Sequence, residues 1–242
     1  MLLLKGEADS INLEGYTAIV PSIGVGNAGQ LACDLIISTL KLKRIGNIWH
    51  EALIPITGPS AFQHEPNTKA ASCEVYVDDS KKVLAIQLRS PLISMHLNDF
   101  HEELVGLLQK CSRVIILTSS FGYEKHTIEA SSFEYIANKE FKQNHADRLG
   151  ALQWTEFSGE VVHGGGNALK LYKALEASNV PALLLFKYVL EGDNTMDASQ
   201  LVKELDDLLE EEIKMKSGSS LKLTAPVSWK LMYGNEVGDL IF

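Results

Sequence analysis

Cysteine is scarce in this chain, and its few cysteines show no pairing pattern. Cys33, Cys73 and Cys111 lie in apolar or small-residue surroundings without C-x-x-C spacing. This excludes the disulfide framework of a small secreted domain, and an odd number of cysteines is typical of a reducing compartment. We therefore expect a protein of the cytoplasm and nucleus in which all three thiols are reduced and mostly buried.

Long apolar runs and an excess of basic charge are also missing. The longest apolar run, at 181–190, contains Lys187 and is shorter than the roughly 20 residues that cross a bilayer. The leucines after Met1 are soon followed by charges, which predicts no secretion signal. A net charge of −9 does not suit a surface that neutralises phosphates. These absences predict a soluble protein that binds neither membranes nor nucleic acid.

The common catalytic signatures are missing as well. No P-loop lysine follows a glycine turn, no G-x-S-x-G motif occurs, and His101-Glu102-Glu103 lacks the second histidine of H-E-x-x-H. The histidines never stand three or four residues apart, so no helix face is predicted to present two of them to a metal. Cys33 lies on or beside an apolar helix face and is predicted to be a buried small hydrophobe rather than a nucleophile. We expect no catalytic residue, metal or cofactor.

One motif does suggest a ligand. The stretch at 18–40, AIVPSIGVGNAGQLACDLIISTL, runs from an apolar strand through Gly24, Gly26 and Gly29 into an amphipathic helix. This spacing matches the G-x-G-x-x-G turn that binds dinucleotides. The acidic residue expected about 20 positions later is represented only by Glu51, which lies within IWHEALIPI and is predicted to be mid-strand. Glycine and asparagine are also what any sharp strand-to-helix turn needs, because they tolerate positive φ.

Apolar strands alternate with helical patterns along the chain. Several predicted strands are apolar at nearly every position, which is typical of strands buried on both faces. The alternation predicts an α/β fold, a three-layer sandwich around a mostly parallel mixed sheet. The segments 73–77 and 83–88 are expected to pair as antiparallel neighbours. Strands are predicted at 16–23, 48–56, 73–77, 83–88, 113–119 and 182–188, and helices at 28–36, 100–108, 168–178 and from 195 onwards.

Three further segments allow two interpretations each. Residues 121–162 have few periodic apolar positions and are predicted to form an irregular excursion, either lid-like or a plain surface loop. The motifs HGGGN at 163–167 and EGDN at 191–194 both precede helices. They either line a ligand crevice, with Glu191 or Asp193 contacting a sugar hydroxyl, or form turns in which Asn194 or Thr195 caps the helix.

Taken together, six segments resemble the proteasome assembly chaperone family. The resemblance implies one domain over 1–242, with an α/β fold similar to nucleoside phosphorylases but without their catalytic equipment. It also implies a chaperone that forms a heterodimer with proteasome assembly chaperone 1, holds α-subunits, promotes α-ring formation and blocks off-pathway α-ring association. The segments are VGNAGQLACDLIISTL (25–40), AIQLRS (85–90), SRVIILTSS (112–120), GGGNALKLY (164–172), LEGDN (190–194) and PVSWKLMYG (226–234).

The resemblance also implies a docking tail around 235–242. Members of this family are thought to dock on the α-ring through a C-terminal hydrophobic residue, a tyrosine and any residue. The corresponding candidates here are Leu240, Ile241 and Phe242. Isoleucine cannot supply the tyrosine hydroxyl, so the tail is expected to bind more weakly or to leave the main anchor to the partner chaperone. A tail packed on its own domain is the alternative, because apolar termini seek cover.

Two functions therefore compete at this point. The first is an assembly chaperone that recognises partner subunits. The second is a nucleotide- or nucleoside-binding α/β enzyme that uses the glycine turn at 24–29 together with residues 191–194. A relative with the same fold and a different client is a third possibility, since fold does not fix function.

Overall fold

The computed structural model describes the chain except for residues 1–2, 7–10, 126–129, 210–220 and 233–242. Within that part, nine strands form one sheet in the order β1-β3-β6-β7-β2-β8-β11-β9-β10. The central strands β7, β2, β8 and β11 are parallel, and antiparallel pairs lie on both sides of them. The strands are β1 (Leu3–Gly6), β2 (Thr17–Pro21), β3 (Lys43–Trp49), β6 (Cys73–Asp78), β7 (Val83–Leu88), β8 (Arg113–Phe121), β9 (Phe133–Ala137), β10 (Thr155–Glu156) and β11 (Ala182–Val189).

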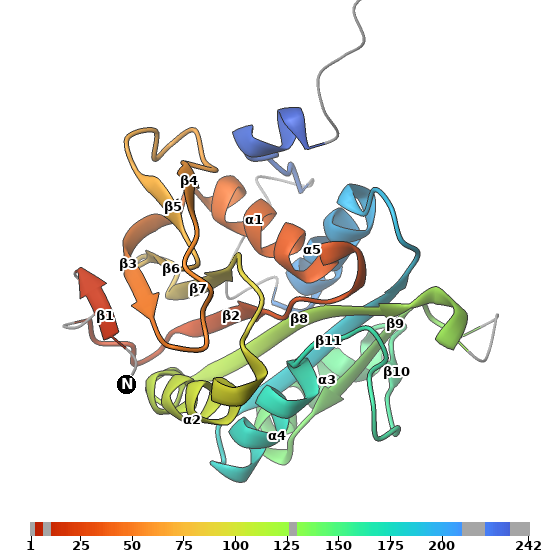
Figure 1. Ribbon diagram of the computed structural model, residues 1–242. Coiled ribbons are helices and arrows are strands. Elements are labelled where there is room, and N and C mark those ends of the chain that lie inside the picture. Colours follow the sequence, from red (N-terminus) through yellow and green to blue (C-terminus); the bar gives the residue numbers. More distant parts are fainter. Residues whose placement is uncertain (1–2, 7–10, 126–129, 210–220, 233–242) are drawn as a thin grey trace, which may run out of the picture.

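Helices cover both faces of this sheet (Figure 1). The helices α1 (Ala28–Leu40), α3 (Lys139–Ala151) and α5 (Thr195–Leu208) pack on one face, and α2 (Leu97–Leu108) and α4 (Ala168–Ala177) pack on the other. A separate pair of short strands, β4 (Thr57–Pro59) and β5 (Lys69–Ala71), lies beside α1. This arrangement confirms the predicted three-layer α/β sandwich. None of the described helices has the length and apolar character needed to cross a bilayer.

Successive side chains of the central strands enter two cores, one on each face of the sheet. In β8, Val114 and Ile116 pack on the side of α2 and α4, whereas Ile115 and Leu117 pack on the side of α1 and α5. Because side chains alternate between the faces of a strand, burial on both faces requires an apolar residue at every position. The prediction of doubly buried strands is therefore confirmed.

The prediction that the three cysteines are buried is also confirmed. Cys33 lies in the core beside α1, and Cys73 and Cys111 lie in the core on the opposite face. Burial raises the pKa of all three thiols, because the low-dielectric interior disfavours a thiolate. These cysteines act as small apolar side chains of the core.

The predicted strand at 48–56 is wrong beyond Trp49. Strand β3 ends there, and the chain turns through Glu51, which is exposed rather than mid-strand. Pro55 lacks the N–H that a sheet ladder needs. The Ser72 hydroxyl takes the place of a neighbouring strand, since it donates to the carbonyl of Ile54 (2.6 Å) and accepts from the N–H of Ile56 (2.9 Å).

The predicted irregular excursion at 121–162 is also wrong in its central part, which forms β9 and α3. Helix α3 is polar around most of its circumference, and its buried residues, Phe141, His145 and Leu149, stand four positions apart. Charged neighbours conceal this narrow apolar stripe in the sequence. Asn138 starts the helix, because its side-chain oxygen accepts from the N–H of Phe141 (3.0 Å).

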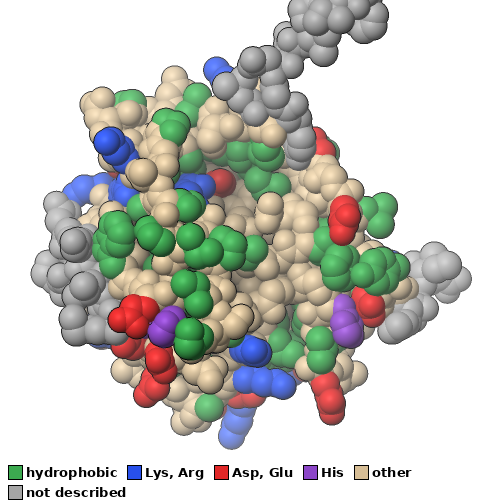
Figure 2. Space-filling model, viewed as in Figure 1, with side chains coloured by type: hydrophobic (Ala, Val, Ile, Leu, Met, Phe, Trp, Pro, Cys, Tyr) green, Lys and Arg blue, Asp and Glu red, His purple; other side chains and the backbone are tan. Residues whose placement is uncertain are grey.

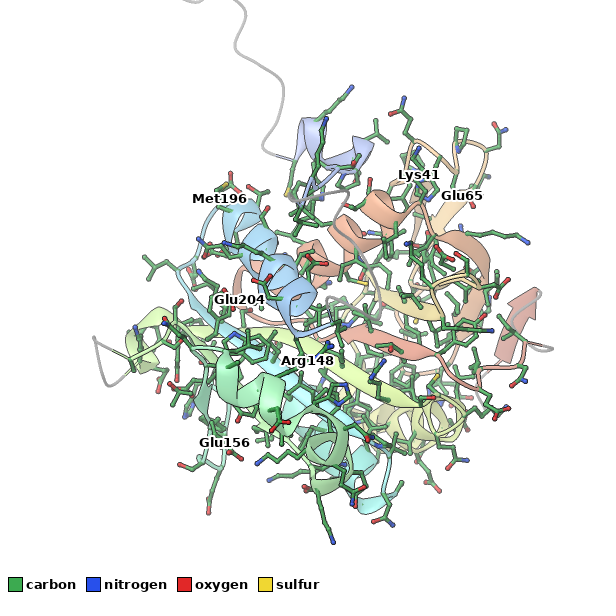
Figure 3. All side chains as sticks on the ribbon, turned by 180° about the vertical axis from the view of Figure 1, so that it is seen from behind. Lys41, Glu65, Arg148, Glu156, Met196 and Glu204 are labelled. Carbon is green, nitrogen blue, oxygen red and sulfur yellow. The ribbon has the colours of Figure 1, made fainter. Side chains whose placement is uncertain are left out.

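Two hydrogen bonds join α3 and the residues after it to α5. Arg148 and Glu204, one partner of each bond, are labelled in Figure 3. Arg148 donates to the carbonyl of Leu208 (2.9 Å), which lies at the end of α5. The indole N–H of Trp154 donates to a carboxylate oxygen of Glu204 (2.7 Å). These bonds tie α3 and Trp154 to α5 in the layer that covers one face of the sheet.

A buried ionic cluster ties α1 to the antiparallel side of the sheet. Arg89 donates to Asp34 of α1 (3.0 Å) and to Glu74 of β6 (2.6 Å). Arg44 of β3 contacts the other oxygen of Glu74 (3.2 Å), and the amide of Gln87 donates to Asp34 (2.6 Å). Burial alone would lower the pKa of Arg89, but the two carboxylates outweigh it and raise that pKa. The guanidinium therefore stays charged.

Removing this cation tests the cluster. We expect Arg89→Met to lower the free energy of unfolding by about 3–5 kcal/mol, because Asp34 loses its cation and Glu74 keeps only Arg44. The matched control is Lys142→Met, which removes an exposed ion pair with Glu156 and should cost at most about 1 kcal/mol. Urea unfolding followed by circular dichroism measures both variants. Equal losses would contradict a structural role for the buried cluster.

Candidate functional site

The three glycine-bearing loops of the sequence meet at the carboxyl ends of the parallel strands. Their meeting point is a shallow hollow of about 560 Å³, to which the loops after β2 and β11 and the loop before α4 all contribute. The N–H of Val25 donates to the carbonyl of Gly164 (2.7 Å), which joins the first loop to the third. The motifs at 163–167 and 191–194 therefore lie beside the turn at 24–29 and line one hollow with it. The lining residues are Ile23, Gly24, Val25, Gly26, Phe121, Gly164, Gly166, Glu191 and Gly192.

The protein's own groups bind two amides of this turn and cover Gly26. A phosphate needs free amide N–H groups at the turn, but Val25 donates to Gly164 and Asn27 donates to Gly24 (3.1 Å). A Cβ built on Gly26 would lie 2.1 Å from the side-chain amide of Asn194, so that amide fills the space above the glycine. The geometry favours the interpretation that residues 24–29 form a tight turn rather than a phosphate-binding loop.

Hydroxyl groups at the end of β8 hold the loops together, and sequence reasoning did not single them out. Each hydroxyl donates to a backbone carbonyl of a neighbouring loop, which satisfies a buried acceptor. The available signal was a run of three hydroxyl residues at the end of an otherwise apolar strand. The bonds run from Thr118 to Gly165 (3.0 Å), from Ser119 to Val25 (2.6 Å) and from Ser120 to His163 (2.8 Å).

The 191–194 turn is also explained by local hydrogen bonds. Asp193 accepts from both the N–H (2.9 Å) and the hydroxyl (2.7 Å) of Thr195, so it closes the first turn before α5. Asn194 donates instead to the carbonyls of Leu190 and Gly192. Asn194 therefore stands at the predicted N-cap position of α5, but its side chain accepts no bond from an early N–H of the helix.

Gly29 allows the first helix to approach the sheet closely. A Cβ at this position would lie 2.4 Å from the carbonyl oxygen of Leu117, a backbone atom of β8. We expect Gly29→Ala to lower the free energy of unfolding by about 1–3 kcal/mol, because helix or strand must shift. Gly106→Ala in α2 is the matched control, since its Cβ would meet nothing within 4 Å. The control should gain about 0.5–1 kcal/mol of helix stability in the same urea titration. A Gly29→Ala variant with the same free energy of unfolding as the wild type would contradict this packing role.

Exposed apolar side chains gather on two parts of one face (Figure 2). The first part, which we name the edge surface, lies on the loops after β3 and β7. The N–H of Ile93 donates to the carbonyl of Ala52 (2.8 Å), and Leu53 bridges to Leu92, so the two loops run side by side. The exposed residues of the edge surface are Trp49, Ile54, Ile56, Ile93 and Met95.

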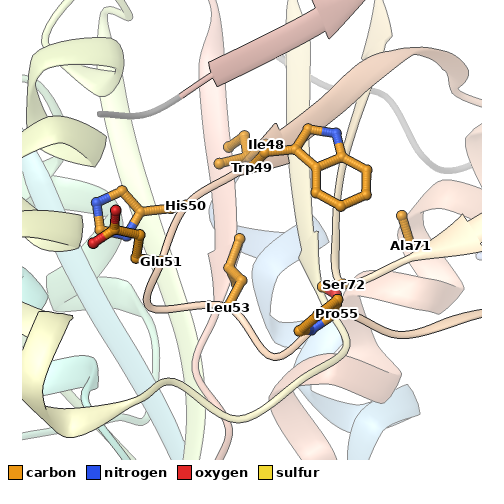
Figure 4. A pocket seen from close by; sticks show the side chains of 8 residues that line it. All are labelled: Ile48, Trp49, His50, Glu51, Leu53, Pro55, Ala71 and Ser72. Carbon is orange, nitrogen blue, oxygen red and sulfur yellow. The ribbon is translucent and has the colours of Figure 1, made fainter.

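A pocket of about 460 Å³ opens within the edge surface (Figure 4). Trp49, Leu53 and Pro55 line its apolar part, and His50 and Glu51 lie at its other end. Apolar pockets on an exposed surface commonly receive an anchoring side chain of a partner. This combination makes the edge surface the strongest candidate for a protein interface among the described residues.

The second apolar part, which we name the terminal surface, lies at the carboxyl ends of β8 and β11. The ring of Phe121 stacks on that of Tyr123, with 5.0 Å between the ring centroids. Leu190 lies beside Gly122, where an added Cβ would come within 3.0 Å of the leucine side chain. Tyr123, Leu190 and Met196 are each at least 70% exposed. Clusters of large exposed apolar side chains are a feature of protein-binding surfaces.

The candidate docking tail lies outside the described residues. Leu240, Ile241 and Phe242, and the whole of 235–242, belong to the part that the structure does not describe. Across the described ranges, no group of three or more histidine, cysteine, aspartate or glutamate side chains is placed to hold a metal ion.

A sheet covered by helices on both faces, with exposed apolar side chains on two parts of the surface, defines the class of protein, an α/β sandwich domain. Residues 18–219 match the PAC2 family. The chain belongs to the PAC2 family, which confirms the resemblance predicted from its segments.

Curated relatives match almost the full length of the chain. It is 33% identical to Proteasome assembly chaperone 2 of Bos taurus, over 97% of this chain and 98% of that protein. It is 32% identical to the protein of the same name from Homo sapiens, over 96% of both chains. A Saccharomyces cerevisiae protein of that name is 24% identical, over 89% of this chain and 94% of the other.

Solved structures share the fold at lower identity. Pyrococcus furiosus PbaA, described as an archaeal homolog of proteasome-assembly chaperone, aligns with a TM-score of 0.69 at 17% identity and covers 89% of both chains. Pyrococcus furiosus PbaB, described as an archaeal proteasome activator, aligns with a TM-score of 0.63 at 15% identity, over 88% of this chain and 91% of the other. These structures support the fold alone.

Proposed function

We propose that this protein is a chaperone for assembly of the proteasome core particle. It acts as a heterodimer with proteasome assembly chaperone 1, promotes α-ring formation and blocks off-pathway association of α-rings, in the cytoplasm and nucleus. The observation that carries the proposal is the similarity, over nearly the whole chain, to proteins named Proteasome assembly chaperone 2. The function consists of binding and involves no catalytic step.

The crevice geometry supports a binding function over the competing nucleotide-binding enzyme. The turn at 24–29 is held by hydrogen bonds within the protein, and the amide of Asn194 lies against Gly26. The Asp193 carboxylate, a candidate sugar ligand, accepts from Thr195. These groups bond to other parts of the protein. We therefore interpret the nucleoside-phosphorylase-like fold as a scaffold for protein-binding surfaces.

The edge surface is the proposed contact with proteasome assembly chaperone 1. Its pocket offers an anchoring site, and its exposed isoleucines would lose contact with water in a heterodimer. Ser72 fixes the backbone of Ile54 and Ile56 by two hydrogen bonds, so the surface is preorganised. Preorganisation lowers the entropic cost of association.

A charge placed on the edge surface tests this contact. We expect Ile54→Asp to reduce recovery of proteasome assembly chaperone 1 at least tenfold when the two chains are co-expressed and purified through a tag on this chain. The reason is that an interface would bury the new carboxylate without a partner. Leu190→Asp on the terminal surface is the matched control and should recover the partner normally. Normal recovery with Ile54→Asp would contradict the proposed interface.

The last three residues are the proposed anchor on the α-ring. We expect deletion of Leu240–Phe242 to remove binding of the heterodimer to α-subunits without changing its melting temperature. We expect Ile241→Tyr to tighten binding by about two- to tenfold, because a hydroxyl adds a hydrogen bond of about 0.5–1.5 kcal/mol. Biolayer interferometry and thermal unfolding measure the two effects. A lower melting temperature after the deletion would instead indicate a tail packed on its own domain.

A further inference from the structure

A groove of about 550 Å³, which we name the helix groove, runs between α2 and α4. Figure 1 shows these two helices side by side on the same face of the sheet. Along α2 the groove reaches from Asn98 to Gln109 at the C-cap, which is about 16 Å, or three helical turns. An opening of this length suits a segment of a protein better than a single small ion. Its lining includes Asn98, Glu102, Gly106, Gln109, Lys170 and Lys173.

A nearly buried histidine lies at the floor of the helix groove. His101 is 6% exposed and is one of the lining residues. Among the described residues, its ring contacts that of Phe100 but forms no hydrogen bond. Burial and the charge of Lys170 lower the pKa of His101 to about 4, so the ring is neutral at pH 7 and offers one donor and one acceptor. Both nitrogens are therefore open to an incoming polar group.

Gly106 keeps the middle of the helix groove open. Glycine weakens a helix interior relative to alanine, so its presence within α2 needs a reason. Packing within the domain does not supply one, because a Cβ built on Gly106 would meet no atom within 4 Å. Close approach of another backbone is a second reason for glycine. Ala174, a small residue of α4, lines the same groove and leaves room for such an approach.

The charged side chains of the helix groove are divided between its two walls. Lys170 and Lys173 stand one turn apart on α4, whereas Glu102 stands on α2, and all three are exposed. None of the three has an ion-pair partner in the part of the chain that the structure describes. The charged lining is thus mainly basic in a protein whose net charge is −9. A complementary partner would present carboxylates toward α4.

The helix groove begins where the edge surface ends. Ile93 and Met95 of the edge surface lie directly before α2, in and beside the short 3-10 helix η3 (Ser94–His96). Asn98, in the first turn of α2, already lines the groove. A partner that covers the edge surface can therefore extend into the groove without a break.

We propose that the helix groove receives an acidic helix of proteasome assembly chaperone 1, as a continuation of its contact with the edge surface. This inference rests on the proposed heterodimer. The carboxylates of the incoming helix pair with Lys170 and Lys173, and its backbone passes over Gly106. A helix fits this position because amphipathic helices dock into grooves of this kind, and two neighbouring helices leave a groove for the ridge of a third.

A glycine substitution tests whether the groove is occupied. Gly106→Gln places a long side chain in the groove without a clash in the domain, and glutamine is the better helix former. We expect its dissociation constant for proteasome assembly chaperone 1, measured by biolayer interferometry, to rise about tenfold or more, because the side chain takes the space of the partner's backbone. The matched control is Gly150→Gln in α3, on the opposite face, where an added Cβ also meets nothing within 4 Å. It should bind like the wild type.

A charge reversal tests the chemistry of the occupant. Lys170→Glu combined with Lys173→Glu should weaken the same binding about tenfold or more, because like charges would then face each other. Lys139→Glu combined with Lys203→Glu is the control, since it changes the net charge equally at exposed positions of α3 and α5. Methyl NMR of Val105 and Ala174, which line the groove, reports occupancy directly. Both signals should shift when the wild-type chain binds the partner.

The outcomes separate the groove from the heterodimer. If Ile54→Asp weakens binding while both groove variants bind normally and the methyl signals do not shift, the groove proposal is overturned and the heterodimer stands. If the wild-type chain does not bind proteasome assembly chaperone 1, both fail. Weakening by Gly106→Gln alone overturns the acidic occupant, and weakening by the lysine reversal alone overturns a helix seated over Gly106. Weakening by both, with shifted methyl signals and unchanged controls, supports the proposal.

Discussion

The structure depends on one constraint, which is that both faces of the central parallel strands must be covered. The run Val114–Leu117 sends alternate side chains into two cores, so neither face can be left to water. This requires α1, α3 and α5 on one side and α2 and α4 on the other. The close approach of α1 at Gly29 follows, because a helix that seals one face of β8 must lie against its backbone. The position of the glycine turn is a consequence of the same requirement.

The carboxyl ends of parallel strands normally offer a crevice for ligands. Here hydroxyl groups from Thr118 to Ser120 bind the surrounding loops, and loop amides bond to loop carbonyls. Part of the hydrogen-bonding capacity at this end of the sheet is therefore used within the protein. This end of the sheet also presents large apolar side chains outward, with Tyr123 and Leu190 exposed beside the hollow. The scaffold is suited to displaying surfaces, as the family relationship and the proposed chaperone function require.

The functional regions are set at different ends of this scaffold. The edge surface lies on the loops that follow β3 and β7, where the bonds of Ser72 and the hydrogen bond from Ile93 to Ala52 hold the chain around a pocket. Residues 221–232 lie against α1, where the N–H of Thr224 donates to the hydroxyl of Thr39.

The sequence by itself determined the fold class, the buried cysteines and the antiparallel pairing of 73–78 with 83–88, because these depend on local apolar patterns. It also determined the family, because the family's characteristic segments can be recognised directly in the sequence. It failed at Ile54 and Ile56, whose apolar side chains look like a buried strand but lie on an exposed loop. It also failed at α3, where charges hide a stripe of only Phe141, His145 and Leu149. Only the tertiary structure decided that the glycine loops fill one another and that 221–232 crosses α1. Both depend on contacts between residues far apart in the chain, such as Thr39 with Thr224, which no local pattern encodes.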